Sequence, residues 1–224
     1  MGNVILVDLN RVNVETSDFK LVDSVDRVGA ETVLMDLNSC TLSELVDHRV
    51  YAPASKLELE LVGDIYVYHE LAVLPFFQEI RGQIEEDGGS KGVFRFRRVF
   101  ENVEASAVIS SDLCVLESIF DIPENMVIKR SREGVEPSHI ILMIHYKGVI
   151  AHVEYTYLRK ELVEIEWSGV GKLIEFHSDD LTPMKPKLMP LQYRVDSIIK
   201  NAKEIDSVID TFMKYQRLIG GEGK

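Results

Sequence analysis

Two histidines, His145 and His152, are the side chains whose type and spacing could do chemistry in this sequence. They lie in two apolar stretches on either side of the dipeptide Lys147-Gly148. If these stretches form a hairpin, both imidazoles project from one face as a diagonal pair that side chains can bridge. A metal would need a third ligand, and Glu154 or His177 could be nominated. Two histidines without a carboxylate at ligand spacing are weak evidence for zinc, so we favour polar residues on a sheet face buried in an oligomer and predict no metal site.

Three other groups of polar residues could bind a ligand. Residues 88–92 superficially suggest a phosphate loop, but they follow a predicted helix and precede a predicted strand, so we expect a turn. Residues 177–180 form an acidic loop without a full set of oxygen ligands for Ca²⁺, and a solvated loop is favoured. The basic residues of two local clusters could hold an anionic ligand or, as we favour, pair with glutamates across an interface. These residues are Arg95, Arg97, Arg98, Lys129, Arg130 and Arg132.

A β-hairpin at residues 140–146 and 149–155 is the element that must position the histidines. Gly148 can adopt the positive φ of a primed two-residue turn, which places Tyr146 opposite Val149. One face of the hairpin is then wholly apolar. The other face is too apolar for a solvated surface and too polar for an ordinary core; it carries Ile141, Met143, His145, Ile150, His152, Glu154 and Thr156.

The rest of the chain alternates shorter elements. Further strands are predicted at residues 4–9, 31–37, 57–61, 64–69, 92–100, 126–129, 161–167 and 172–176, the last two continuing the hairpin as consecutive antiparallel strands. Helices are predicted at residues 41–50, where Thr41 and Glu44 have capping-box spacing, from Pro75 to the glycines at 88–89, at 112–120 and at 195–218. A proline-rich segment at 183–190 is expected to be irregular.

The composition describes an ordinary globular protein without a strongly basic surface. The chain has 224 residues, a formal net charge of −12 and two cysteines, Cys40 and Cys114. The negative charge argues against nucleic acid or an anionic membrane as the main partner. No apolar run is long enough to span a membrane, the amino end does not resemble a signal peptide, and the cysteines lack ligand spacing. We therefore expect a cytoplasmic protein with buried thiols.

The order of the motifs resembles a known family of oxidoreductases. A proline-started helix, a basic strand, a helix ending at F-D-I-P (120–123), then Y-K-G-V-I-A-H-V-E (146–154) and W-S-G-V-G-K-L-I-E-F (167–176) follow one another. This order resembles the second half of the glucose-fructose oxidoreductase and inositol dehydrogenase (Gfo/Idh/MocA) family. The resemblance implies an α+β fold: a reduced Rossmann-like α/β unit at 1–74, and at 75–224 an open, mostly antiparallel sheet with helices on one face. In the family, that sheet serves the substrate and oligomer contacts.

The departures from this family concern its chemistry. The glycine-rich phosphate loop is absent, because the apolar run at 4–9 continues into Asn10-Arg11-Val12 with no glycine nearby. The lysine of the family's E-K-P motif corresponds to Leu37, and its catalytic histidine corresponds to Ile109. Only Asp112 of that helix motif is retained. Leucine and isoleucine cannot transfer protons, so the resemblance predicts loss of the family's hydride chemistry.

The sequence therefore favours a non-catalytic, oxidoreductase-like protein that forms a homo-oligomer, most simply a dimer, and acts as a binding or scaffold subunit. The expected contact is the hairpin face with Met143, His145, Ile150 and His152. No cofactor is predicted. Two alternatives stay open: an NAD(P)-dependent oxidoreductase with atypical residues, and a sensor of a small ligand that uses the old substrate cleft between the two regions. Asp112 is a further candidate for an interface or ligand contact.

Overall fold

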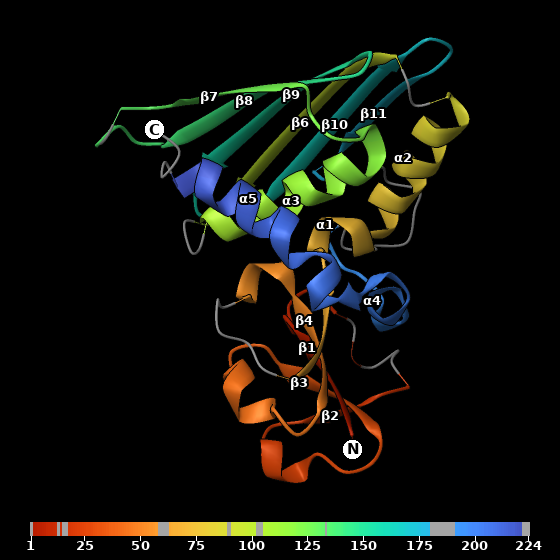
Figure 1. Cartoon of the computed structure of the whole chain (residues 1–224), viewed down its shortest axis with the longest axis vertical. Coiled ribbons are helices and arrows are strands. Elements are labelled where there is room, and N and C mark those ends of the chain that lie inside the picture. The colour runs from red at the N-terminus through yellow and green to blue at the C-terminus, as the bar shows by residue number, and fades with distance from the viewer. Residues whose placement is uncertain are drawn as a thin grey trace. The chain divides into compact units, whose positions relative to one another are not determined.

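The protein forms two compact units, each built on a sheet of six described strands (Figure 1). The computed structural model describes residues 2–12, 14, 18–57, 63–88, 91–101, 105–132, 134–179 and 191–220. The first unit comprises residues 1–77, 106–115 and 191–224, and the second comprises residues 78–105 and 116–190. The units interleave along the chain, and the domain boundary expected after residue 74 stays a prediction.

The sheet of the first unit is parallel except at one edge. Its order is β12-β5-β4-β1-β3-β2. The strands are β1 (Asn3–Val7), β2 (Lys20–Val22), β3 (Thr32–Asp36), β4 (Arg49–Pro53), β5 (Asp64–Tyr68) and the antiparallel β12 (Lys203–Glu204). Val4 and Leu6 of β1 and Val33 and Met35 of β3 are buried. Continuous apolar strands of this kind are typical of a parallel sheet covered on both faces.

The helix expected at residues 41–50 is only a 3₁₀ turn, η3 (Leu42–Leu45). The capping interaction does form, because the Thr41 backbone N–H donates to the Glu44 carboxylate at 2.7 Å. The prediction of a longer helix was wrong because the chain continues into β4, which pairs in parallel with both β1 and β5. A short helical segment is marginal on its own, and pairing in the middle of a sheet outweighs it.

The remaining short turns of the first unit are η2 (Val25–Arg27), η4 (Ala54–Lys56) and α1 (Glu70–Val73). The single helix expected at 195–218 is two helices, α4 (Val195–Asn201) and α5 (Ile209–Gly220), with η5 (Ile205–Ser207) before the second. They are separated because Ala202 is extended, with φ −66° and ψ 144°, and the next two residues pair with β5 as β12.

The sheet of the second unit is mostly antiparallel, with order β11-β10-β6-β9-β8-β7. Its strands are β6 (Gly92–Phe100), β7 (Asn125–Arg130), β8 (His139–Tyr146), β9 (Val149–Tyr157), β10 (Leu162–Gly169) and β11 (Leu173–His177). The expectation of consecutive antiparallel strands was wrong at one place: β6 lies between β9 and β10, parallel to β9 and antiparallel to β10. The predicted fold class, an α/β unit with an open, mostly antiparallel sheet, is confirmed.

The predicted hairpin is confirmed together with its register. Tyr146 pairs with Val149 and Ile140 pairs with Tyr155, and Gly148 in the turn has φ 87°. Glycine adopts this conformation without the steric cost that other residues meet. The hairpin's apolar face is buried, as expected from the alternation of side chains.

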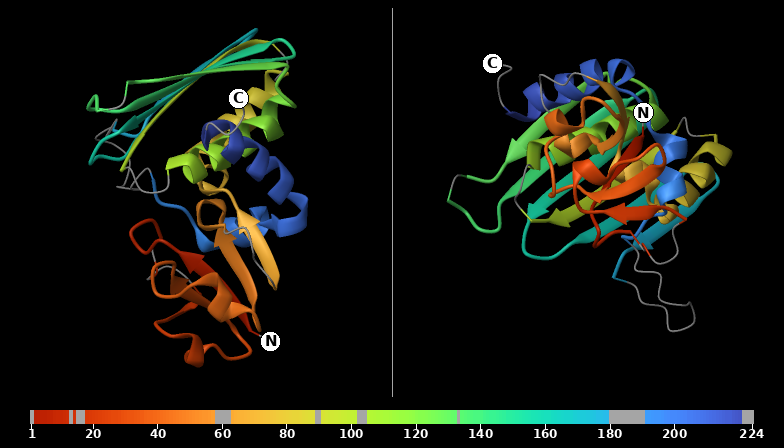
Figure 2. Two further views of the ribbon diagram at one scale, coloured as in Figure 1. Left: turned by 60° about the vertical axis from the view of Figure 1, so that its left-hand side comes forward. Right: turned by 90° about the horizontal axis from the view of Figure 1, so that it is seen from below.

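Helical segments of the second unit cover one face of its sheet (Figure 2). They are the later part of α2 (Pro75–Glu86) and the last turn of α3 (Ala105–Phe120), a helix that begins earlier than the expected residue 112. The Phe120 ring lies 5.2 Å from Phe94 and 5.7 Å from Trp167, centroid to centroid. After α2, Asp87 accepts the Trp167 indole N–H at 3.2 Å and the Gly171 backbone N–H at 3.0 Å. No described helix of this unit covers the opposite face, which we call the open face.

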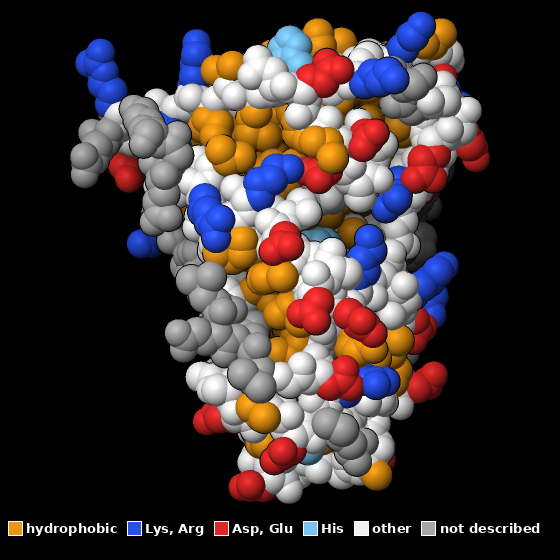
Figure 3. Space-filling model, viewed as in Figure 1, with side chains coloured by type: hydrophobic (Ala, Val, Ile, Leu, Met, Phe, Trp, Pro, Cys, Tyr) orange, Lys and Arg blue, Asp and Glu red, His pale blue; other side chains and the backbone are white. Residues whose placement is uncertain are grey.

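Some expectations fall outside the described residues: the strand at 57–61 beyond Leu57, the turn at Gly89 and Ser90, and the proline-rich segment at 183–190. In the part of the chain that is described, no helix combines the length and apolar character needed to cross a membrane. Acidic and basic side chains are interspersed over the surface seen in Figure 3.

Candidate functional site

The carboxyl end of β1 is the first candidate site, because open parallel sheets bind ligands where the strand order reverses. Strands β3 and β2 lie on one side of β1, and β4 and β5 lie on the other. Asp8 follows β1, and its Oδ1 accepts the Asn10 backbone N–H at 2.9 Å. The Arg11 guanidinium lies 3.5 Å from Asp8 and 3.9 Å from Glu70. The Asp8 carboxylate thus occupies the position where, in a phosphate loop, backbone N–H groups would donate hydrogen bonds to the phosphate.

The segment before α4 lies beside this strand end. The Tyr193 backbone N–H donates to the Arg11 carbonyl oxygen at 2.9 Å, and Tyr193 also forms a parallel bridge with Val12. The Tyr68 hydroxyl donates to the Leu6 carbonyl oxygen at 2.8 Å. Burial raises the pKa of both tyrosines, so their hydroxyls stay neutral. This end of β1 is built from the chain's own side chains and suits a pyrophosphate poorly, because anions bind at helix ends and glycine loops with free N–H groups.

The positions that correspond to the family's catalytic residues are packed among apolar groups. Leu37 follows β3; its backbone N–H donates to the Val7 carbonyl oxygen at 3.0 Å, and its half-buried side chain packs on the core of the first sheet. Ile109 in α3 is completely buried. Asp112 is also completely buried, and its proposed role towards a ligand stays a prediction.

A pair that the sequence did not suggest joins His69 and Ser111. The His69 Nδ1 lies 3.0 Å from the Ser111 hydroxyl; Ser111 is buried and His69 is half-buried in the first unit. Burial first, and then the charge of Lys203, lowers the pKa of His69 to about 4. The imidazole is therefore neutral at pH 7. Because 42 positions separate the two residues, no local pattern could have revealed the pair.

The open face of the second sheet holds the histidines from which the sequence argument began. His145 pairs with Ile150, and His152 pairs with Met143, so the two imidazoles form the expected diagonal. Ile150 is 41% exposed and Met143 is 36% exposed, and His145 is exposed. The face therefore combines apolar and titratable side chains, as predicted, and its role as a contact surface stays a prediction.

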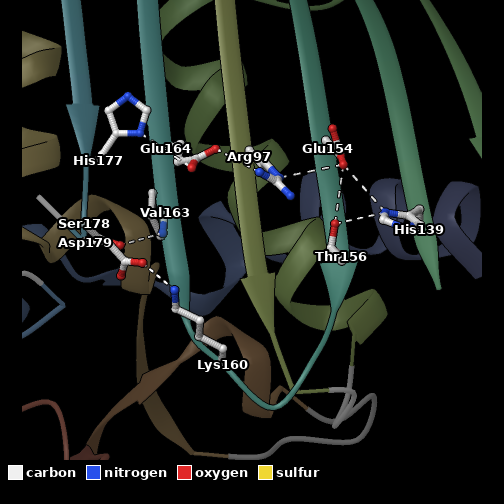
Figure 4. Close-up of polar contacts among 10 residues, drawn as sticks. All are labelled: Arg97, His139, Glu154, Thr156, Lys160, Val163, Glu164, His177, Ser178 and Asp179. Atoms are coloured by element: carbon white, nitrogen blue, oxygen red, sulfur yellow. Dashed lines mark hydrogen bonds and ion pairs between the residues drawn. The ribbon is translucent and has the colours of Figure 1, made fainter. Parts of the chain in front are cut away.

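A row of ion pairs crosses the open face from β11 to β8 (Figure 4). The Glu164 carboxylate lies 3.5 Å from His177 on one side and 3.3 Å from Arg97 on the other. The Arg97 guanidinium lies 3.8 Å from Glu154, which in turn lies 3.6 Å from the His139 imidazole. The row alternates acid and base, so each carboxylate has two basic neighbours.

A parallel second row lies two residues further along the strands. It runs through Glu175, Glu166, Arg95 and His152, and Arg95 bonds to Glu166. A hollow of about 280 Å³ lies between the two rows; it is lined by Arg95, Phe96, Arg97, His152, Glu154, Glu164, Ile165, Glu166, Glu175 and His177. The hollow carries two arginines and four glutamates, so its net charge is −2 when the histidines are neutral.

The arginines of the basic cluster on β6 lie near glutamates of the same chain. Arg95 and Arg97 pair with glutamates of their own sheet, and the buried Arg98 lies 3.8 Å from Glu161. The expected pairing of this cluster with glutamates across an interface stays a prediction. In the described part of the chain, no group of three histidine, cysteine, aspartate or glutamate side chains could hold a metal.

The sequence matches no known protein-family model and no curated protein. Solved structures are similar instead. The crystal structure of a probable dehydrogenase from Thermotoga maritima has a TM-score of 0.54 and 11% identity, over 97% of this chain and 86% of that chain. The WlbA (WbpB) dehydrogenase from Thermus thermophilus, in complex with NAD and UDP-GlcNAcA, has a TM-score of 0.49 and 10% identity, over 97% and 94% of the chains. A Gfo/Idh/MocA family oxidoreductase from Vibrio cholerae has a TM-score of 0.45 and 9% identity, over 96% and 89%.

The fold, with a mostly parallel sheet and a mostly antiparallel one, is similar to that of the Thermotoga maritima protein across nearly the whole chain. The predicted resemblance to a family of oxidoreductases agrees with this similarity at the level of fold. At these identities the similarity concerns the fold alone, so activity has to be argued from the residues.

Proposed function

We propose that this protein is a non-catalytic protein with a dehydrogenase fold, a binding or scaffold subunit that forms a homodimer through the open face of its second sheet. The observation that carries the first part is the carboxyl end of β1. There Asp8 accepts the amide of Asn10, and Glu70 lies near Arg11. Two carboxylates would face the two phosphates of a dinucleotide, and like charges at short distance repel.

The packing of Leu37 and Ile109 supports the same proposal. A proton donor or acceptor must reach the substrate within hydrogen-bond distance. Neither side chain has an ionisable group, and Ile109 is completely buried. The proposal therefore assigns no catalytic residue and no cofactor to this chain.

Titration with NADH and NADPH, followed by nucleotide fluorescence, tests the absence of a cofactor. We expect no saturable binding at concentrations up to about 1 mM, the weak end of useful affinities. The WlbA dehydrogenase, which was crystallised with NAD, is a suitable positive control. Saturable binding at micromolar concentration would instead favour the NAD(P)-dependent oxidoreductase.

Two properties of the open face support the second part of the proposal. Large apolar side chains are exposed on it, including Leu173 at 67% and Ile150 at 41%. A solvated face of an antiparallel sheet normally carries polar residues at most positions, and apolar surface of this kind commonly marks an interface. The charged residues Arg95, Arg97, Glu164 and Glu166 already have partners within the chain, which lowers the cost of removing them from water.

Sedimentation velocity on an Ile150→Glu variant tests the dimer face. We expect the wild type to sediment as a dimer and the variant to dissociate, because a carboxylate would be buried without a partner. Ile199→Glu is the matched control, since Ile199 has a similar exposure of 39% and lies on α4 of the first unit. A variant at residue 150 that stays dimeric would exclude the open face.

A further inference from the structure

We propose that the two-fold axis of this dimer runs between β6 and β10, parallel to the strands. Strand β6 of each copy then faces β10 of the other copy, and β9 faces β11. The inference rests on the proposed dimer and adds to it the position of the axis and the residues that meet. It follows from the order of charges on the open face.

When a two-fold axis passes between two neighbouring strands that carry opposite charges, each charge of one copy faces the opposite charge of the other copy. Arg97 on β6 and Glu164 on β10 are directly opposite in register and 3.3 Å apart. Rotation about an axis between these strands places Arg97 of one copy over Glu164 of the other, and the reverse. Arg95 and Glu166 repeat the arrangement two residues further along. Each rotated pair forms a square of alternating charge.

The next strands continue this complementarity. With the same axis, β11 of one copy faces β9 of the other. The strand registers then place His177 over Glu154, and Glu175 over His152. The following row places Leu173, which is 67% exposed, over Ile150. Stacked sheets lie about 10 Å apart and cross at roughly 30°, so the opposition is closest at β6 and β10, beside the axis.

Other positions of the axis fit the face less well. An axis between β6 and β9 would place the Glu164 carboxylate over the aliphatic Ile141, and burying a charge against an apolar group is unfavourable. An axis over β8 would place Met143 of one copy over Met143 of the other, but it would leave Leu173 uncovered. Of the three positions compared, the axis beside Arg97 and Glu164 places both arginines over glutamates and Leu173 over Ile150, with Val93 over Ser168 next to the axis.

Charge reversal with mixing of variants tests the axis. Arg97→Glu alone and Glu164→Arg alone each create two like-charge contacts in a homodimer, so we expect each to dimerise at least about tenfold more weakly than the wild type. An equimolar mixture of the two should form a heterodimer with nearly wild-type affinity, because both contacts become complementary again. Repair of a pair within one chain cannot explain recovery on mixing. The readout is native mass spectrometry, which separates the three possible dimers.

Two comparisons make the test specific. Arg49 and Asp64 form an exposed cross-strand ion pair at 2.7 Å in the first unit, and reversing either charge there should leave dimerisation unchanged. Met143→Lys should also leave it nearly unchanged, since β8 lies beyond the four facing strands. If circular dichroism shows that a charge-reversed variant at Arg97 or Glu164 is unfolded, the same experiment is done with Arg95→Glu and Glu166→Arg.

The possible failures separate this inference from the proposal on which it rests. A wild type that is monomeric would overturn the dimer itself. Alternatively, the wild type dimerises and Ile150→Glu disrupts the dimer, but the charge-reversed variants form no preferential heterodimer. This result would overturn the proposed axis and leave the open face as the interface. Dissociation by Met143→Lys would point to an axis nearer β8 and would also contradict the inference.

Discussion

Acidification should destabilise the first unit through His69. This imidazole is half-buried, lies 3.0 Å from the Ser111 hydroxyl, and has its pKa lowered to about 4, first by desolvation and then by Lys203. In the unfolded chain a histidine binds its proton near pH 6.5. Between these two values the unfolded state binds a proton that the folded state does not, so stability falls as the pH falls.

The size of the effect follows from the two pKa values. A change from 6.5 to about 4 corresponds to a total loss of roughly 3 kcal/mol, which is reached when the pH has fallen below both pKa values. Between pH 7 and pH 5 the loss is about 2 kcal/mol by the same linkage relation. Above about pH 6.5 the contribution of His69 is fully present, and below about pH 4 the loss is complete.

Urea denaturation of the wild type and of His69→Gln at pH 7 and pH 5 measures this effect. Glutamine can hydrogen-bond to Ser111 but does not titrate. Subtracting the variant's change in unfolding free energy from that of the wild type therefore removes the contribution of the carboxylates, which both proteins share. We expect the wild type to lose about 2 kcal/mol more than the variant between these pH values. Equal losses in the two proteins would show that His69 is not held neutral in the fold.

Two further substitutions test the packing argument. Ile109→His should lower the free energy of unfolding by about 2 to 3 kcal/mol, because a polar ring enters a fully buried apolar site, and denaturant melts should show a smaller loss, about 1 kcal/mol, for Ile109→Val. Asp87→Ala should cost about 2 kcal/mol, since it removes the acceptor of the Trp167 and Gly171 N–H groups. Thermal melts should place Asp87→Asn between that variant and the wild type, and an unchanged melting temperature for Asp87→Ala would contradict the role of this contact.

Local patterns predicted the elements whose partners are close in sequence. The hairpin could be predicted together with its register, because Lys147-Gly148 fixes the turn and the alternation of side chains fixes the faces. The helix beginning at Pro75 and the strand at 92–100 were found in the same way. The resemblance aligned Leu37 and Ile109 with catalytic residues; Leu37 packs on the core of the first sheet and Ile109 is completely buried.

Non-local pairing accounts for what the sequence could not predict. Strand β4 was missed because its partners, β1 and β5, supply the stability that its short run lacks. The row through Arg97 exists only because β6 inserts between β9 and β10, and nothing local requires that position. The same insertion places glutamate partners of Arg95 and Arg97 within one chain. The pair of His69 and Ser111 likewise depends on how α3 packs.

The molar mass of the wild type in solution tests the central claim most directly. The chain has a mass of 25.5 kDa, so a dimer through the open face has twice that mass, 51 kDa. Multi-angle light scattering at pH 7, over a range of protein concentrations and without nucleotide, should give 51 kDa at micromolar concentration. A mass of 25.5 kDa at every concentration would contradict the proposal that this protein works as an assembled, non-catalytic subunit.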